Sequence, residues 1–201
     1  MSSCYLDGWN LIFCCSRKKP AHDQVPCQED ITQDVILDKQ FIGDEVVIVK
    51  SDLRICGCGA ALATGPIVQN KAYFEVKVQC GGVWGVGLAS RKCDLNRLPL
   101  GNNEESWVLR SDGGICHNSK VVHQLNVMPD EGDIIACTYN HAELYFYING
   151  CQVEFPLTGI RGTVYPAVFV DDGAILDVIF KNFCYPPPDG YSRILFEKSL
   201  L

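Results

Sequence analysis

Residues 131–155, EGDIIACTYNHAELYFYINGCQVEF, alternate apolar and polar side chains on both sides of an Asn-Gly pair. Such alternation is typical of a β-strand with one buried face, since successive side chains point to opposite sides. Asn149-Gly150 favours a two-residue hairpin turn, because both central positions of that turn need a positive φ. On one face of this hairpin the expected pairs are all apolar: Ile148 with Cys151, Phe146 with Val153 and Leu144 with Phe155.

A second turn is predicted at Asn140-His141, and it continues the same apolar face into a third strand without a register slip. The expected pairs are Tyr139 with Ala142, Cys137 with Leu144 and Ile135 with Phe146. The opposite face carries Tyr145 and Tyr147, and it is expected to meet water. The stretch therefore predicts a three-stranded antiparallel meander, but this meander supplies packing and no chemistry.

The rest of the chain also consists of short apolar runs bounded by Gly, Asn, Asp and Pro, which is typical of an all-β sandwich. Only residues 93–100, CDLNRLPL, are expected to form a short helical turn. The stretch YPPPDGY, residues 185–191, is too rich in proline for a central strand and is predicted to run as an extended segment around the sheet edge. No stretch approaches the roughly 20 apolar residues of a membrane span.

The 201 residues fit one domain with a sizeable core. Residues 1–30 show no sustained period and are predicted to be a Cys-rich tail, with the β-sandwich domain at residues 31–201. The twelve cysteines are too sparse and too irregularly spaced for a disulfide framework, and the N-terminus is a poor signal peptide. We therefore expect free thiols and a cytoplasmic location.

The formal charge of −7 is unevenly distributed. Residues 1–20 carry Asp7 against Arg17-Lys18-Lys19 and so contribute +2, which leaves −9 for the remainder. Nucleic-acid binding relies on Lys and Arg to neutralise phosphates, so an acidic body argues against a nucleic-acid partner.

The N-terminal tail offers a different kind of site. Acylation of Cys4, Cys14 and Cys15 beside the Arg17-Lys18-Lys19 cluster would combine two weak membrane signals, which is what stable anchoring requires. Palmitoylation would then hold the chain peripherally at the cytosolic face of a membrane. An unmodified tail that packs its aromatic residues on the sandwich explains the same sequence equally well.

Chemical motifs are weak elsewhere. The histidines and cysteines show no local signature of a Cys-His nucleophile, so no catalytic residues and no enzyme activity are expected. Cys56-Gly57-Cys58 is a single C-x-C without a second knuckle, which argues against a zinc site. GGVWGVG, residues 81–87, lacks the G-x-G-x-x-G spacing and is flanked by strands, so no cofactor is expected.

Five segments, in order, resemble the SPRY domain, the core of the B30.2 family. The matching segments are YFEVKV (73–78), WGVGLA (84–89), SWVLRSDGGICHN (106–118), GDIIACTYNHAELYFYINGCQVEF (132–155) and YPAVFVDDGAILDVIF (165–180). Further segments resemble a small member of that family that is little more than a SPRY domain: VVIVK (46–50), IRGTVYP (160–166), PPP (186–188) and ILFE (194–197).

The resemblance implies a bent antiparallel β-sandwich of the concanavalin-like jelly-roll type that binds a peptide or protein surface through shallow loops and is not catalytic. It implies the role of a cytoplasmic adaptor. By motif, the binding loops fall on residues 53–54, 81–82, 96–101 and 171–172. The site residues carried over from the family are Leu53, Arg54, Gly81, Gly82, Asn96, Pro99, Gly101, Asp171 and Asp172.

The sequence departs from the peptide-binding branch of this family at two loops. Asp171-Asp172 stands where those proteins place apolar or aromatic residues, and residues 93–101 lack their aromatic residue. We therefore expect a basic or polar ligand, with Arg54 and the aspartate pair selecting for charge, and Gly81-Gly82 and Pro99 allowing close backbone approach. The alternative is a redox- or metal-responsive thiol protein that uses Cys56, Cys58 and the N-terminal thiols.

Overall fold

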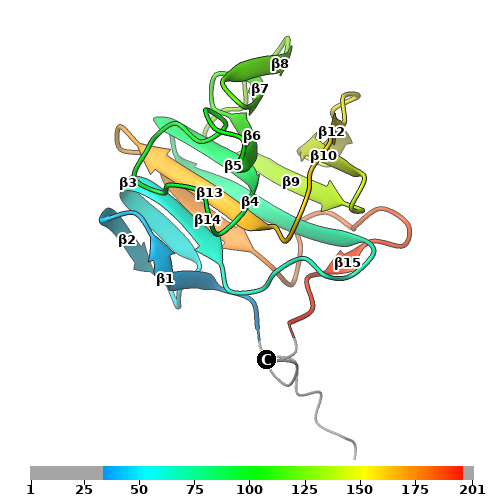
Figure 1. The fold of residues 1–201 in the computed structure, drawn as a ribbon, viewed down its shortest axis with the longest axis horizontal. Coiled ribbons are helices and arrows are strands. Elements are labelled where there is room, and N and C mark those ends of the chain that lie inside the picture. Colours follow the sequence, from blue (N-terminus) through cyan, green and yellow to red (C-terminus); the bar gives the residue numbers. More distant parts are fainter. Residues whose placement is uncertain (1–33, 197–201) are drawn as a thin grey trace, which may run out of the picture. The chain divides into compact units, whose positions relative to one another are not determined.

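The computed structural model describes residues 34–196, which form strands and connecting loops without a helix (Figure 1). Within this range, nothing has the length and apolarity of a membrane-spanning helix. Residues 93–100, where a helical turn was expected, form turns and bends instead. The strands are β1 (Leu37–Ile42), β2 (Glu45–Val49), β3 (Arg54–Ala63), β4 (Ala72–Cys80), β5 (Val83–Ala89), β6 (Ser106–Arg110), β7 (Gly114–His117), β8 (Lys120–Gln124), β9 (Ile134–Tyr139), β10 (Glu143–Ile148), β11 (Cys151–Gln152), β12 (Leu157–Thr158), β13 (Tyr165–Asp171), β14 (Ile175–Ile179) and β15 (Ser192–Arg193).

Strand β3 belongs to both layers of the sandwich. Its first half pairs with β2 and β14, and its second half pairs with β1 and β13. Gly57 and Gly59 lie at the crossing with φ values of 97° and 138°, which an L-residue rarely adopts. The strands around them are antiparallel, apart from the short parallel pair of β15 with β4. The expectation of a bent antiparallel β-sandwich is confirmed.

The hairpin of β10 and β11 has the predicted turn, with Ile148 opposite Cys151. The expected pair of Leu144 with Phe155 is wrong, because Leu144 faces Leu157 of β12. The N–H of Phe155 donates to the carbonyl oxygen of Val153 at 2.8 Å, and this tight turn shifts the chain between β11 and β12. The Asn-Gly pair therefore predicted the position of the turn correctly. The predicted strand register is correct only for the residues next to the turn.

The register between β9 and β10 differs from the prediction by two residues. Leu144 faces Tyr139 and Phe146 faces Cys137, so the central turn residues are His141-Ala142 rather than Asn140-His141. The Asn140 Oδ1 atom accepts the N–H groups of Ala142 and Glu143 at 3.0 and 2.7 Å, and this favours the shifted turn. Because side chains alternate with a period of two, the shift leaves the same residues facing inward.

The core lies between the two layers and consists of β-branched, aromatic and aliphatic side chains. Every residue of β9 is buried, so this strand packs on both faces. The alternation in the sequence predicted only one of these two buried faces. Among the largest fully buried side chains are Trp84, Tyr73, Phe74, Phe146, Phe169 and Leu88.

One buried carboxylate anchors the proline-rich segment. Glu75 is fully buried and accepts hydrogen bonds from the Tyr73 hydroxyl at 2.7 Å and from the N–H groups of Cys184 and Tyr185 at 2.7 and 2.9 Å. Residues 186–188 follow outside any strand, as expected for a Pro-Pro-Pro sequence. The three donors offset the cost of burying the carboxylate.

Candidate functional site

Two of the predicted loops meet at one edge of the sandwich. Strand β14 pairs with β4 and β13 pairs with β5, so Gly81-Gly82 and Asp171-Asp172 are brought together. A Cβ atom on Gly82 would lie 2.6 Å from the Asp172 carbonyl oxygen and 2.7 Å from the Ala174 nitrogen. Gly82 also has a φ of 131°, whereas a Cβ atom on Gly81 would have nothing within 4 Å. The close approach at Gly82 is thus to the protein's own turn.

The aspartate turn contacts strand β3. Asp171 is half-buried and accepts the N–H of Asp172 at 2.8 Å, while Asp172 is exposed. Asp171 also lies beside Cys58, where hydrogen bonding to its carboxylate, followed by burial, raises the pKa of the Cys58 thiol. Cys58 in turn faces Glu45 across the β2–β3 pair. The aspartate turn therefore lies beside Cys58 and Glu45, neither of which was predicted to be part of the binding loops.

The loop between β5 and β6 packs on the same side through Asn96. Its Oδ1 accepts the N–H of Asp44 at 2.7 Å, and its Nδ2 donates to the Asp44 carboxylate at 3.2 Å. A Cβ atom on Gly43 would lie 2.9 Å from the Leu95 carbonyl oxygen and 3.2 Å from the Gly59 Cα atom. The loop is therefore held close to both the β1–β2 turn and the bend of β3.

Two other residues of that loop differ in exposure. Pro99 is half-exposed, whereas Gly101 is buried, and its N–H donates to the Ser106 hydroxyl at 2.7 Å. A Cβ atom on Gly101 would lie 2.7 Å from the Cys116 side chain. Gly101 therefore supports the loop from behind and does not present a surface to a partner.

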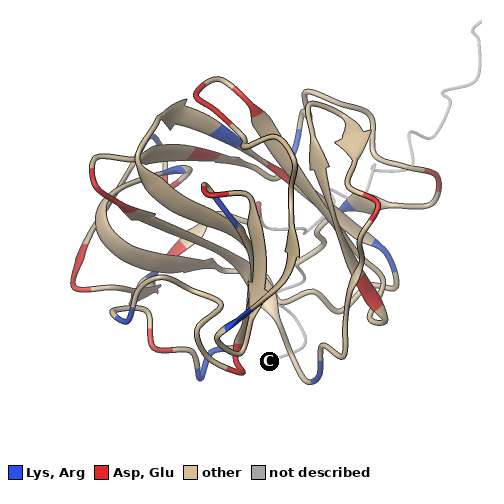
Figure 2. Ribbon diagram, turned by 90° about the horizontal axis from the view of Figure 1, so that it is seen from above, with Lys and Arg blue, Asp and Glu red and all other residues tan. Residues whose placement is uncertain are grey.

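These contacts connect residues of five segments into one surface, which we call the acidic loop face. It carries four carboxylates, and acidic positions elsewhere also fall mainly in turns (Figure 2). The ion pairs formed between residues 34 and 196 include none of the four. The acidic loop face consists of Asp44, Glu45, Cys58, Gly82, Asn96, Asp171 and Asp172.

Leu53 and Arg54 are not part of the acidic loop face. At the other end of the β2–β3 hairpin from Cys58, Leu53 ends the turn and Arg54 begins β3, and Leu53 packs against the core. The Arg54 Nε and Nη2 atoms lie 2.6 and 3.0 Å from the Asp177 carboxylate, and Lys50 Nζ lies 2.6 Å from it. Arg54 is thus occupied by an internal ion pair.

We call Asp177, Lys50 and Arg54 the Asp177 cluster. The Asp177 side chain is only 6% exposed. Burial opposes its ionisation, but the hydrogen bonds from Arg54 and Lys50 outweigh burial and lower the carboxyl pKa. The cluster therefore stabilises the β3–β14 contact.

Sequence reasoning missed Asp44 and Glu45, and it named Cys58 only as a candidate redox or metal thiol. The Gly43-Asp44 pair between two strand-like runs signals a turn, and the alternating glycines of residues 56–59 signal a bend. Neither pattern predicts that these segments lie close to the Asp171 turn. That proximity follows from the pairing of β3 with both β2 and β13.

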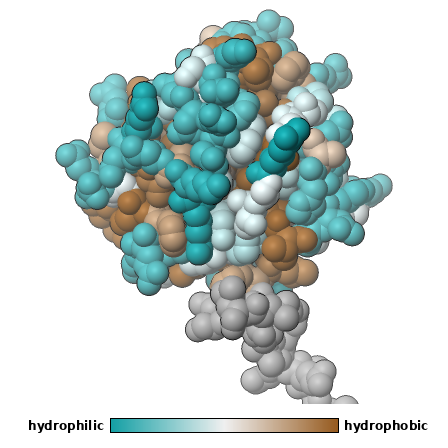
Figure 3. All heavy atoms as spheres, in the orientation of Figure 1, coloured by the Kyte–Doolittle hydropathy of each residue, from teal (hydrophilic) through white to brown (hydrophobic). Residues whose placement is uncertain are grey.

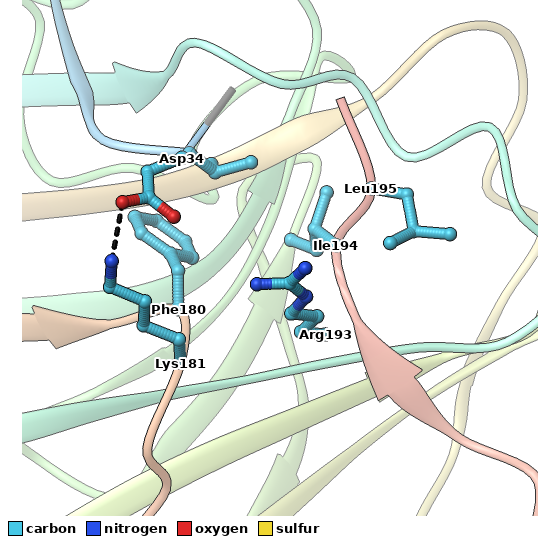
Figure 4. A pocket seen from close by; sticks show the side chains of 7 residues that line it. Asp34, Phe180, Lys181, Arg193, Ile194 and Leu195 are labelled. Atoms are coloured by element: carbon cyan, nitrogen blue, oxygen red, sulfur yellow. Dashed lines mark hydrogen bonds and ion pairs between the residues drawn. The ribbon is translucent and has the colours of Figure 1, made fainter. Parts of the chain in front are cut away.

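A small pocket lies where the described chain begins and ends (Figure 4). Asp34 forms an ion pair with Lys181 there, and Arg193 and Ile194 line the opposite side. The volume of about 20 Å³ admits little more than one water molecule. This pocket is therefore too small to serve as a ligand site.

Apolar docking is not favoured on the face seen in Figure 3, which is mainly hydrophilic with separate hydrophobic patches. The most exposed large apolar residues of the described range, Val127 and Val68, are 77% and 68% exposed and lie in different loops. Single exposed apolar residues are normal on soluble domains.

Burial and a nearby carboxylate make several of the described thiols less reactive. The eight cysteines of residues 34–196 are free, and that range holds no group of three or more metal-ligating side chains. Burial raises the pKa of Cys93, Cys116 and Cys137, and the Asp171 carboxylate raises that of Cys58. A raised pKa lowers the thiolate fraction on which reactivity and metal binding depend.

The sequence profile of the SPRY domain family matches residues 71–183, more than half of the chain, and the chain belongs to this family. It is similar over most of its length to SPRY domain-containing protein 7. The Bos taurus protein is 47% identical over 193 residues, which cover 94% of this chain and 97% of that protein. The Homo sapiens protein is 46% identical over 193 residues with the same coverage of 94% and 97%.

Solved structures show the same fold at low sequence identity. The SPRY domain of human HERC1 has a TM-score of 0.59 and 15% identity, and the match covers 73% of this chain and 99% of that chain. The TRIM65 PSpry domain has a TM-score of 0.59 and 11% identity, with 74% and 90% covered. SPRY domains are protein-interaction modules that are generally non-catalytic, and this supports a protein-binding role.

Proposed function

We propose that the acidic loop face binds a basic or polar segment of a protein partner, and that the chain acts as a non-catalytic adaptor. The observation that carries this proposal is the set of four carboxylates that lack a Lys or Arg partner among the described ion pairs. Unpaired carboxylates on one face attract a cationic segment and give it orientation.

The face is also built to bind without a large rearrangement. Gly82 packs on the backbone of the aspartate turn, and Asn96 fixes the β1–β2 turn through two hydrogen bonds. Val83 is 41% exposed and lies opposite Asp171, so it offers apolar contact beside the charges. Loops that are already ordered lose little entropy on binding, which favours affinity.

The experiment is proximity labelling and pull-down in cells with the wild type and an Asp171→Lys, Asp172→Lys variant. We expect specific partners to disappear with the variant. A Glu154→Lys, Asp189→Lys variant is the matched control, since it makes the same charge change at exposed positions outside the face. Variants are compared at equal thermal stability. An unchanged partner list for the loop variant would show that this face is not used.

We also propose that Cys4, Cys14 and Cys15 are acylation sites that tether the chain to the cytosolic face of a membrane. These residues lie outside the described range, and the proposal rests on their position beside Arg17-Lys18-Lys19. Hydroxylamine-sensitive acyl exchange should label the wild type and not a Cys4→Ser, Cys14→Ser, Cys15→Ser variant. Equal labelling of the two would refute acylation at these cysteines.

The alternative of a redox-responsive thiol protein is separated from these proposals by thiol titration. A sensor needs an exposed thiol with a lowered pKa. Cys58 is half-buried and its pKa is raised, so we expect it to react more slowly than a free cysteine. A fast, low-pKa thiol at Cys56 or Cys58 would instead favour the sensor.

A further inference from the structure

Three cationic side chains gather around a hollow at the far end of the strands that carry the aspartate turn. Tyr165 pairs with Ala89 at this end of β13 and β5, whereas Asp171 pairs with Val83 at the other end. The hollow has a volume of about 340 Å³ and is formed by the chain after β5 and the chain before β13. It is therefore separate from the acidic loop face.

The first cation, Arg91, is held in a fixed position by two aromatic rings. Its guanidinium carbon lies 4.2 Å from the Phe41 ring centroid and 4.7 Å from the Tyr165 ring centroid. Its only ion-pair contact in the described range is Asp38 at 3.8 Å. The two cation–π contacts orient Arg91 without neutralising its charge, so the guanidinium is able to pair with an anionic ligand.

The other two cations, Lys92 and Arg161, are exposed and take part in none of the ion pairs of residues 34–196. The one carboxylate in the lining is Glu105, which accepts a hydrogen bond from the Ser90 hydroxyl. The backbone N–H of Lys92 donates to the same hydroxyl at 3.1 Å, and this bond fixes the start of the loop between β5 and β6. Three cations thus face one carboxylate that is already hydrogen-bonded, in a chain whose net charge is −7.

We propose that this hollow binds the phosphate group of a phosphate monoester. Two guanidinium groups and one ammonium supply the charge, and planar guanidinium groups match phosphate oxygens in pairs. The Thr163 hydroxyl, also in the lining, adds a neutral donor. The hollow has room for more than the phosphate alone, so the organic body of the ester fits beside it.

The first test is titration of the whole chain with O-phosphoserine at pH 7.5, followed by amide chemical shifts. We expect shifts at residues 90–92 and 161–163. An Arg161→Gln, Lys92→Gln variant should bind at least tenfold more weakly, while Lys120→Gln with Lys39→Gln, two exposed lysines outside the lining, should bind as the wild type does. Equal weakening in both variants, or no effect in either, would overturn the proposal.

A second pair of variants tests the sign of the local charge. Glu105→Gln removes the carboxylate in the lining, and Glu104→Gln makes the same change one residue away outside it. Binding should become tighter in the first variant and stay unchanged in the second. Identical behaviour of the two would mean that only net charge matters, and the site would be refuted.

Two probes distinguish a phosphorylated protein from a small phosphate ester as the natural ligand. A phosphoserine peptide that binds more tightly than free phosphoserine indicates a phosphorylated protein, and equal affinity indicates a small phosphate ester. The unphosphorylated peptide must fail to bind, because its binding would contradict recognition of phosphate. The Asp171→Lys, Asp172→Lys variant should keep phosphoserine affinity, which separates this site from the acidic loop face.

Discussion

The acidic loop face and the Asp177 cluster place carboxylates in opposite situations. Asp177 is almost fully buried and bonds to Lys50 and Arg54, whereas none of the four carboxylates of the loop face pairs with Lys or Arg in the described range. A paired and buried carboxylate contributes to stability, and removing its charge leaves its partners uncompensated. An exposed and unpaired carboxylate contributes little to folding and is available to a ligand. The difference indicates a structural role for the Asp177 cluster and supports the binding role that we propose for the acidic loop face.

The largest effect is expected where the backbone holds the loop face together. Gly82→Ala would place a methyl group 2.6 Å from the Asp172 carbonyl oxygen at a φ of 131°. Strain and overlap together should lower the free energy of unfolding by on the order of 3 kcal/mol in urea denaturation. Gly81→Ala is the matched control and should change little, since that position is open. Equal losses for both would show that the aspartate turn is not held by this contact.

The next largest loss of stability is expected when the buried carboxylate of Asp177 is replaced. Asp177→Asn keeps the side-chain shape but leaves Arg54 and Lys50 without a counter-charge. Because these partners are partly exposed, we expect a loss of about 2 kcal/mol, below the usual cost of breaking a fully buried pair. Asp171→Asn should stay within about 0.5 kcal/mol of the wild type by the same urea measurement. A larger loss for Asp171→Asn would contradict the contrast between the two regions.

The contribution of Asp177 should also depend on pH. Its pKa is lowered in the folded state from the ordinary value of 3.8, so the unfolded chain binds the proton more readily. The stabilisation is therefore present above pH 3.8 and is lost as the pH falls through the lowered folded-state pKa. In urea denaturation, the difference in the free energy of unfolding between the wild type and Asp177→Asn should become smaller as the pH falls in this range. A difference that is constant with pH would show that the ion pair is not its source.

The smallest effect probes the contact between the aspartate turn and β3. The Asp171 carboxylate raises the pKa of the Cys58 thiol, so Asp171→Asn should lower that pKa and speed Cys58 alkylation at pH 8. Asp172→Asn should leave the rate unchanged, since its carboxylate is not among the groups that shift this thiol. Rates are followed by mass spectrometry of the Cys58 peptide. Equal acceleration by both variants would indicate a general charge effect.

Several local features were predictable because they depend on neighbouring residues. The alternation of residues 143–148 placed Leu144 and Phe146 in the core, where both are fully buried. Asn149-Gly150 gave the correct turn, since few other pairs adopt two positive φ values. The resemblance of ordered segments gave the SPRY fold and family, which the comparisons confirm.

Contacts between distant segments were not predictable in this way. A shift of two residues between β9 and β10 leaves the inward face unchanged, so the apolar pattern does not distinguish Asn140-His141 from His141-Ala142 as the turn. Arg54 looked available for a ligand because its partner Asp177 lies 123 residues away. Pairing partners at such separations depend on the sheet as a whole.

The sequence by itself determined the all-β class, the inward faces of the strands and the residue types in each loop. These follow from side-chain period, turn chemistry and charge, all of which act within a few residues. Only the tertiary structure decided that Asp44, Cys58 and Asp171 share one face, and that Arg91 and Arg161 share another. The physical reason is that β3 crosses between the layers at Gly57 and Gly59, and strand pairing then brings together loops that no local rule relates.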